Sequence, residues 1–360
     1  MWIEAVRTVL PENRYEQGKI TEAVEELLPG EPGTLRRFHA ATRVEARNLA
    51  LPLERYGGLD GFGAANDAYI GVALNLGTRA VTDALKGAGL APGDVDHLVF
   101  CSSTGVATPS LDSRVAQQAG LRPDVRRVPM FGLGCAGGAA GIARLHDILY
   151  GRSGQVGLLV CVELCSLTMQ RDDGSVANLI ASGLFGDGAA ALVAVSDERP
   201  DGLVEPGGVT GSRGRIGPRV VATKSRLYPG TRRLMGWEVG EFGLRIVLAP
   251  ELVDLVEARL ADDVEGFLAE HGLSIAEVNS WVCHPGGPKV IDAIGRVLHL
   301  PEHALDVTWN SLRRLGNLSS VSVLNVLQET IAHRRPGPGE PAVLMALGPG
   351  FAAELVLLRW

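Results

Sequence analysis

The stretch GLGCAGGAAG, residues 132–141, decides how this chain is interpreted. Residues 128–131 end an extended apolar segment, and from Ala139 onward apolar residues recur at helical spacing. Cys135 is therefore predicted at a strand-to-helix turn, at or near a helix N-terminus. A helix end contributes about 0.3 to 1 kcal/mol, whereas lowering a thiol pKa from about 8.5 to 6.5 needs about 2.7 kcal/mol. A thiolate nucleophile here therefore requires a cationic partner elsewhere in the chain.

A histidine and an asparagine lie in two further glycine-flanked loops. His284 follows a short apolar strand and precedes Pro-Gly-Gly-Pro, and Asn317 precedes an apolar helix expected over residues 321–331. Histidine supplies the cation, and an amide beside a helix start suits an oxyanion-binding role. Each of the three residues alone has an ordinary structural explanation. A lone cysteine is commonly a buried apolar residue, and a His or Asn in a loop is commonly a turn or cap residue. The three together predict nucleophilic catalysis.

Composition favours a cytoplasmic enzyme that acts on small molecules. The 360 residues are 46% hydrophobic, enough for two core-bearing lobes, and no apolar run reaches the roughly 18 residues of a membrane span. The N-terminus shows no secretory signal, and a net charge of −7 argues against a nucleic-acid partner. Five cysteines without a CxxC pair predict neither a disulfide framework nor a metal site. Reduced and mostly buried thiols are expected at Cys101, Cys161, Cys165 and Cys283.

Two segments of the chain resemble one another. Residues 95–101 and 278–283 are predicted apolar strands, and each follows a helix and a glycine-containing turn. This repeat predicts duplicated α/β lobes at 1–205 and 206–360. Chance similarity of two buried strands is the alternative. The expected linker, residues 197–234, is rich in Gly, Pro and Arg. It is either a solvated hairpin or a cationic rim near a phosphate-bearing substrate.

Five motifs together resemble the type III polyketide synthases of the chalcone synthase superfamily. They are the Cys135 turn, LFGDGAA at 184–190, HPGGP at 284–288, NLSS at 317–320 and GPGF at 348–351. The similarity covers nearly the whole chain and is weakest in the first fifty residues. It implies a thiolase-like α/β fold, with duplicated αβαβα lobes forming a five-layered sandwich, in a homodimer. It also implies that Cys135 carries the acyl chain, that His284 and Asn317 serve decarboxylation and condensation, and that Phe185 is a gatekeeper.

The resemblance implies repeated condensation of malonyl-CoA onto an acyl-CoA starter held on Cys135, followed by cyclisation. CoA thioesters are the substrates, and no metal or other cofactor and no membrane partner is expected. Arg36, Arg37 and Arg43 resemble the family's CoA phosphate-binding region, with simple surface solvation as the alternative. A second gatekeeper is expected at Ile246. The expected cavity residues are Ser103, Thr104, Thr108, Cys165, Thr168, Met169, Trp237, Leu347, Gly348 and Pro349.

Several of these positions depart from the plant pattern. Ile246 and Leu347 stand where plant members have phenylalanine, and Trp237 stands where they have glycine. Residues 47–54 resemble bacterial members that accept fatty acyl starters, so the preferred product class is an alkylresorcinol or alkylpyrone. Two other functions stay open. One is a single condensation of the ketoacyl-acyl-carrier-protein synthase III type, and the other is a non-catalytic thiolase-fold scaffold.

Overall fold

A mixed nine-stranded sheet organises the protein, which is described here from a computed structural model covering residues 1–29, 32–197 and 217–360. The strand order is β11-β12-β13-β8-β1-β7-β6-β4-β5. Two ribbons, β2-β3 and β9-β10, lie outside this sheet. The strands are β1 (Trp2–Val9), β2 (Asn13–Glu16), β3 (Ala46–Leu49), β4 (Val95–Cys101), β5 (Arg126–Met130), β6 (Val156–Leu164), β7 (Asp187–Val195), β8 (Arg219–Leu227), β9 (Met235–Gly240), β10 (Gly243–Leu248), β11 (Ser280–Cys283), β12 (Pro341–Gly348) and β13 (Ala352–Arg359).

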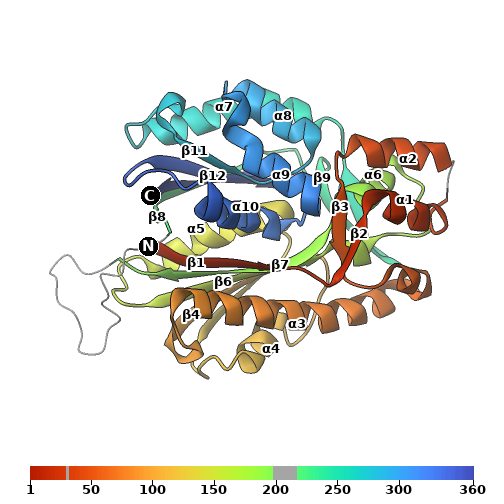
Figure 1. The fold of residues 1–360 in the computed structure, drawn as a ribbon, viewed down its shortest axis with the longest axis horizontal. Coiled ribbons are helices and arrows are strands. Elements are labelled where there is room, and N and C mark those ends of the chain that lie inside the picture. Colours follow the sequence, from red (N-terminus) through yellow and green to blue (C-terminus); the bar gives the residue numbers. More distant parts are fainter. Residues whose placement is uncertain (30–31, 198–216) are drawn as a thin grey trace.

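The helices form three layers around the two halves of this sheet (Figure 1). Helices α5 and α10 lie in the middle, α3 and α4 cover the half that contains β6 and β7, and α7 and α8 cover the half that contains β11 and β12. The duplicated five-layered α/β sandwich predicted from the sequence is therefore confirmed. The helices are α1 (Gln17–Glu25), α2 (Pro32–Ala41), α3 (Gly61–Ala88), α4 (Leu111–Gln118), α5 (Gly137–Leu149), α6 (Val176–Leu184), α7 (Leu252–Ala269), α8 (Pro288–Val297), α9 (Asp306–Leu315) and α10 (Ser320–His333).

The central strands are apolar because both of their faces are covered. All nine residues of β6 are buried, and β6 lies between the antiparallel β7 and the parallel β4. Strands covered by helices on both faces read as continuous hydrophobic runs. Helix α10 is likewise buried over most of its length, because it contacts strands of both halves of the sheet. The core therefore surrounds the middle layer, in which the Cys135 turn begins.

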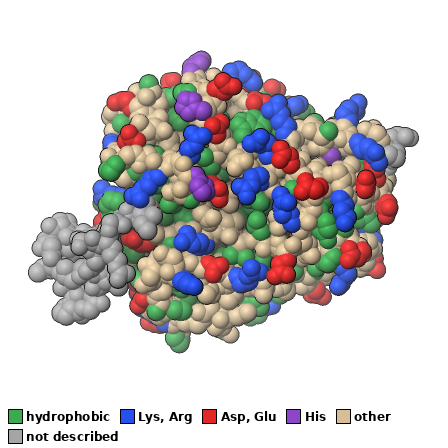
Figure 2. Space-filling view, viewed as in Figure 1, with side chains coloured by type: hydrophobic (Ala, Val, Ile, Leu, Met, Phe, Trp, Pro, Cys, Tyr) green, Lys and Arg blue, Asp and Glu red, His purple; other side chains and the backbone are tan. Residues whose placement is uncertain are grey.

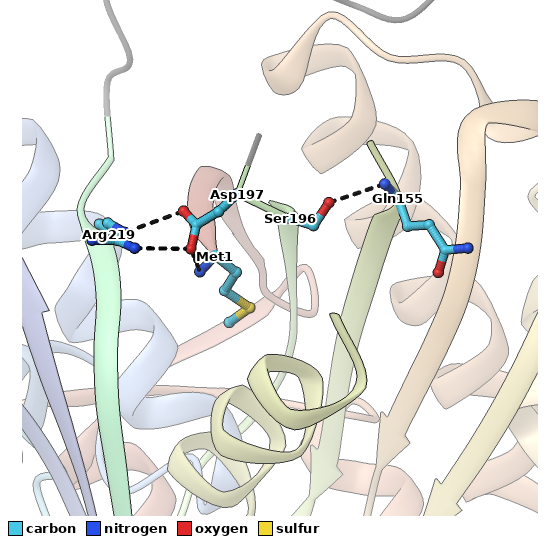
Figure 3. A network of polar contacts seen from close by, with 5 residues as sticks. All are labelled: Met1, Gln155, Ser196, Asp197 and Arg219. Carbon is cyan, nitrogen blue, oxygen red and sulfur yellow. Dashed lines mark hydrogen bonds and ion pairs between the residues drawn. The ribbon is translucent and has the colours of Figure 1, made fainter. Parts of the chain in front are cut away.

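The two halves of the sheet meet at the start of β1 (Figure 3). Asp197, just after β7, accepts hydrogen bonds from the guanidinium of Arg219 on β8 at 3.1 and 3.0 Å. The amino group of Met1 lies 3.2 Å from the same carboxylate. This carboxylate therefore ties together β1, β7 and β8. The expected boundary at 205/206 and half of the expected linker, residues 198–216, lie outside the described residues.

Strand β5, at the edge of the sheet, is more exposed than its sequence suggests. Its side chains are exposed except for the half-buried Met130, and the exposed fractions of Val128 and of Phe131, which follows the strand, are 39% and 56%. Apolar side chains on an unpaired edge strand form a surface suited to a partner. The four cysteines expected to be reduced and buried, Cys101, Cys161, Cys165 and Cys283, are free and buried, and Cys135 is free and buried as well. Within the described residues, no helix is both long and apolar enough to cross a membrane.

Candidate active site

Cys135 lies on a short 3-10 turn, Gly134–Ala136, that leads directly into α5. The predicted position at a helix start is confirmed. The turn packs closely against the end of β12, and glycine is required on both sides of this contact. A Cβ on Gly134, whose φ is +47°, would lie 2.8 Å from Pro349, and a Cβ on Gly348 would lie 2.5 Å from the Ala136 nitrogen. The 348–349 loop therefore holds the nucleophile's turn in place.

Asn317, between α9 and α10, directs its amide at the cysteine. Its Nδ2 donates to the Gly286 carbonyl at 3.2 Å and lies 3.8 Å from the Cys135 sulfur. The backbone N–H of Ser319 donates to Asn317 Oδ1 at 2.8 Å, which fixes the amide plane. Loops far apart in the chain thus bring a thiol and an amide together, as the motif order predicts.

His284 follows β11 directly, at the tip of the strand as predicted. Its backbone N–H donates to Met345 on β12, but neither ring nitrogen has a hydrogen-bond partner among the described residues, although both are buried. The ring lines a small apolar cavity together with Leu347 and Gly286. Buried polar atoms without partners are uncommon in native proteins and call for an explanation. Here they leave the imidazole free to bond a substrate.

Burial sets the ionisation of both residues. Desolvation raises the pKa of Cys135 to about 12, against hydrogen bonds from Ser319 and Asn317, and desolvation lowers the pKa of His284 to about 3. Low-dielectric surroundings disfavour whichever form is charged, so the free site holds a thiol and a neutral imidazole. The thiolate–imidazolium pair expected from the sequence is not the state that burial favours here, and it stays a prediction.

The predicted gatekeeper is bonded to the Asn317 segment through its neighbours. Phe185 directly follows α6, and its neighbour Gly186 donates from its backbone N–H to the Asn317 carbonyl at 3.0 Å. The Asn317 N–H donates to the carbonyl of Leu184 at 2.9 Å. Two backbone hydrogen bonds therefore join the segment of the predicted gatekeeper to Asn317.

Six of the predicted residues line one cavity, which has about 600 Å³ of empty space, part of it open to solvent. Trp237 on β9 pairs directly with Ile246 on β10, so both side chains face the cavity from one ribbon. Apolar side chains of α1 close another wall. The six predicted residues that line this cavity are Cys165, Thr168, Met169, Phe185, Trp237 and Ile246.

The other predicted cavity residues lie elsewhere. Ser103 is buried and bonded through both its N–H and its hydroxyl, and Thr108 is exposed beside a cis Thr108–Pro109 bond. Thr104 lines a smaller pocket with Thr168, and Leu347 lines the pocket of His284. Gly348 and Pro349 pack on the Cys135 turn rather than line a described pocket.

Sequence reasoning missed a buried polar cluster on the wall of the main cavity. Arg47, only 2% exposed, donates from Nε to Gln17 Oε1 at 3.1 Å and from Nη1 to the Phe185 carbonyl. Burial lowers the pKa of Arg47 to about 10, and burial raises that of the nearby Asp187 to about 6. Arginine is almost never fully buried without a partner, so the sequence offered no signal for this position.

The three arginines considered for CoA binding do not share one arrangement. Arg36 forms a bidentate pair with Glu25 at 2.7 Å, and Arg43 lies over Trp309 and 3.8 Å from Asp292. Arg37 lies over the ring of Phe38. On the face shown in Figure 2, Lys and Arg alternate with Asp and Glu across the region of α1 and α2. Phosphate binding by these arginines stays a prediction.

Comparison with known proteins assigns the family. A model described as "Chalcone and stilbene synthases, N-terminal domain" matches residues 63–198, and the corresponding C-terminal domain matches residues 219–360. The chain belongs to this family. It is therefore a type III polyketide synthase, an acyltransferase that condenses malonyl-CoA units repeatedly and cyclises the product. The single-condensation and scaffold alternatives are not supported.

Three relatives resemble this synthase over nearly its whole length. The 1,3,6,8-tetrahydroxynaphthalene synthase of Streptomyces peucetius subsp. caesius is 51% identical over 99% of this chain and 93% of its own. The 3,5-dihydroxyphenylacetyl-CoA synthase of Amycolatopsis orientalis is 30% identical over 99% of this chain and 92% of its own. The solved structure of 1,3,6,8-tetrahydroxynaphthalene synthase from Streptomyces coelicolor A3(2), a bacterial type III polyketide synthase, matches with a TM-score of 0.91 and 28% identity, over 100% of this chain and 99% of that one.

Proposed function

We propose that this synthase makes 1,3,6,8-tetrahydroxynaphthalene, or a close aromatic relative, from malonyl-CoA alone. The observation that carries the proposal is the 51% identity, across 99% of this chain, to an enzyme of that name. A naphthalene skeleton has ten carbons and each decarboxylated malonyl unit supplies two, so five units suffice. This product class replaces the alkylresorcinol or alkylpyrone that residues 47–54 favour.

Apolar side chains from two elements bound the main cavity. Trp237 and Ile246 close it from the β9-β10 ribbon, and Ile20 and Val24 close it from α1. Enlarging a cavity whose walls are close-packed costs free energy, because packed side chains have to move.

The first chemical step loads the nucleophile. The Cys135 thiol passes its proton to the neutral ring of His284, and the resulting thiolate attacks the thioester carbonyl of the starter. Coenzyme A leaves as its thiol, taking a proton from His284, and the acyl group remains on the sulfur. The start of α5, directly after the turn, stabilises the thiolate as it forms.

The second step forms the new carbon–carbon bond. A malonyl-CoA carboxylate leaves as carbon dioxide, and its electron pair becomes a thioester enolate. His284 and Asn317 Nδ2 donate hydrogen bonds to the enolate oxygen. The enolate carbon attacks the Cys135 thioester, and the thiolate leaves. The extended chain is now a thioester of coenzyme A. The Cys135 thiolate attacks this thioester, and coenzyme A leaves and takes up a proton, which returns the chain to Cys135 for the next round.

We also propose that the enzyme acts as a homodimer in the cytoplasm, where CoA thioesters are available, without a metal or organic cofactor. The exposed edge strand β5, with Val128 and Phe131, offers an apolar surface to a second copy. The condensation itself balances with CoA thioesters alone. Over the described ranges, no group of three or more His, Cys, Asp or Glu side chains is placed to hold a metal ion.

Incubation of the purified protein with malonyl-CoA alone tests the proposed product. Mass spectrometry should find a pentaketide naphthalene product, and the Cys135→Ala variant should make none. Parallel reactions include octanoyl-CoA as a competing starter. A product that carries the octanoyl chain, with none from malonyl-CoA alone, would show that the starter is a fatty acyl group.

A further inference from the structure

The carbonyls of residues 183–185, at and just after the end of α6, each accept a hydrogen bond from a segment outside that helix. Gln17, at the start of α1, donates from Nε2 to the first carbonyl at 2.8 Å. The backbone N–H of Asn317 donates to the second at 2.9 Å, and Arg47 Nη1 donates to the third, which belongs to Phe185. The last carbonyls of a helix have no partner within the helix. Three parts of the chain therefore fix the end of α6, which lies beside α1 (Figure 1).

Arg47 is an expensive donor for this position. It is 2% exposed, and no Asp or Glu among the described residues forms an ion pair with it. Its acceptors are Gln17 Oε1, at 3.1 Å from Nε, and the Phe185 carbonyl, while Nη2 has no partner in the described structure. A cation removed from water without an acidic partner costs free energy. The negative end of the α6 dipole offsets part of that cost, so the guanidinium is committed to the residue predicted as the gatekeeper.

Close packing fixes the direction of the Arg47 side chain. A Cβ on Gly316, whose φ is +72°, would lie 3.0 Å from Arg47 Cδ and 2.6 Å from the Leu184 carbonyl oxygen. The apolar stem of Arg47 therefore passes closely by the residue that precedes Asn317. The Gln17 amide uses both of its ends, because Oε1 accepts from Arg47 and Nε2 donates to the end of α6. Each of the two side chains thus orients the other.

The residue whose carbonyl Arg47 holds also contributes its ring to the main cavity. Phe185 is half-buried and lines this cavity, and Arg47 and Ser182 line the same wall. The carbonyl and the ring belong to one residue, so a rotation of the backbone at Phe185 moves both. A donor that fixes the carbonyl therefore also fixes where the ring lies on the cavity wall.

We propose that Arg47 is a positioning residue that, together with Gln17, holds the Phe185 ring on the cavity wall and thereby limits the size of the acyl group that reaches Cys135. The inference rests on the synthase site proposed above, with Phe185 as its gatekeeper. Without the guanidinium, the Phe185 carbonyl is left without a donor. An unpaired buried carbonyl is costly, so the segment turns toward another donor, the ring leaves the wall and the passage widens.

The variant Arg47→Met tests this directly, because methionine keeps most of the apolar stem and removes every donor. The readout is the rate of Cys135 acylation by octanoyl-CoA divided by the rate with acetyl-CoA. Intact-protein mass measures both rates, with Cys135→Ala as background. One hydrogen bond to a charged group is worth a tenfold change or more, so Arg47→Met should raise this ratio by at least about fivefold. A ratio that stays at the parental value or falls overturns the proposal.

A double-mutant cycle separates positioning from a general structural effect. Phe185→Ala should raise the octanoyl-to-acetyl ratio by itself, because the ring is absent. Arg47→Met in that background should leave the ratio where Phe185→Ala put it, since no ring remains to be released. An equal rise in both backgrounds overturns the proposal, because Arg47 would then act on the fold and not through the ring. A parental ratio in Phe185→Ala also overturns it, because Phe185 would then not be a gatekeeper.

Asn48→Leu is the matched control from the same strand. Asn48 is buried and donates from Nδ2 to the Pro11 carbonyl at 2.7 Å, and none of its hydrogen bonds in the described structure reaches α6. This variant loses a buried hydrogen bond but should keep the parental ratio, and a rise equal to that of Arg47→Met overturns the proposal.

Gln17→Met provides an independent test from α1. It removes the hydrogen bonds to Arg47 and to the end of α6 and should raise the ratio in the same direction. If Arg47→Met does not fold, an unmoved ratio in Gln17→Met overturns the proposal by itself. The acylation assay contains no malonyl-CoA and forms no polyketide, so its result is independent of the product proposed above.

Discussion

Replacement of Gly348 by alanine should damage catalysis by displacing the turn that carries Cys135. Gly348 ends β12 against the Cys135 turn, and an added Cβ would lie 2.5 Å from the Ala136 nitrogen, 2.7 Å from the Ala136 Cβ and 2.8 Å from the Leu133 carbonyl oxygen. Ordinary contacts begin at 3.4 Å, so the turn and the strand must separate by about 0.6 to 0.9 Å. Two of these atoms are backbone, which no side-chain rotation can relieve.

The size of the effect follows from that displacement. Overpacking of this kind costs about 1 to 3 kcal/mol of unfolding free energy. A displacement near 1 Å at a reacting group costs up to about a hundredfold in rate. Gly348→Ala should therefore lower the rate of malonyl-CoA condensation by about tenfold to a hundredfold and should leave a folded protein.

Product formation and urea unfolding measure the two effects separately. The matched control is Gly266→Ala, because Gly266 lies on the exposed face of α7 and an added Cβ meets nothing within 4 Å. That variant should keep the parental rate and gain about 0.5 to 1 kcal/mol from helix propensity. A Gly348→Ala enzyme with the parental rate and stability would refute the argument that close packing at this loop positions Cys135.

Four other outcomes are expected. Cys135→Ala should fold but gain no acyl mass after exposure to an acyl-CoA; an acylated variant would move the carrier to another cysteine. Asn317→Ala should still be acylated yet lose about a hundredfold in malonyl-CoA decarboxylation, since one enolate donor is worth about 2.7 to 4 kcal/mol. Trp237→Gly should lengthen the product or admit a bulkier starter at some cost in stability, as product masses would show. Because burial raises the pKa of Glu163 to about 7, the folded state binds an extra proton between about pH 4.5 and 7, and unfolding free energy falls as pH rises through that window. Glu163→Gln should abolish this fall in unfolding free energy, which is on the order of 3 kcal/mol. Urea unfolding at about pH 4.5 and at about pH 7 measures the difference.

Local patterns in the sequence were enough to predict the helix and the strand beside the site and to identify the family. The small residues after Cys135 predicted the helix that the structure begins at Gly137, and the apolar run before His284 predicted β11. Such patterns are short-range, because backbone propensity and apolar periodicity act within a few residues. The order of the five motifs along the chain was enough to identify the family, because each motif forms one loop of the same site.

The arrangement of the site was decided by the tertiary structure. That the Asn317 amide lies 3.8 Å from the Cys135 sulfur depends on packing between segments 182 residues apart, and that Ser103 bonds Glu163 rather than lining the main cavity depends on the same packing. Burial, which only the folded chain defines, makes the Cys135 thiol and the His284 imidazole neutral. The sequence by itself determined which groups the protein has and the turns that present them. The fold determined which groups meet and how they ionise, because distance and desolvation belong to the packed structure and not to the order of residues.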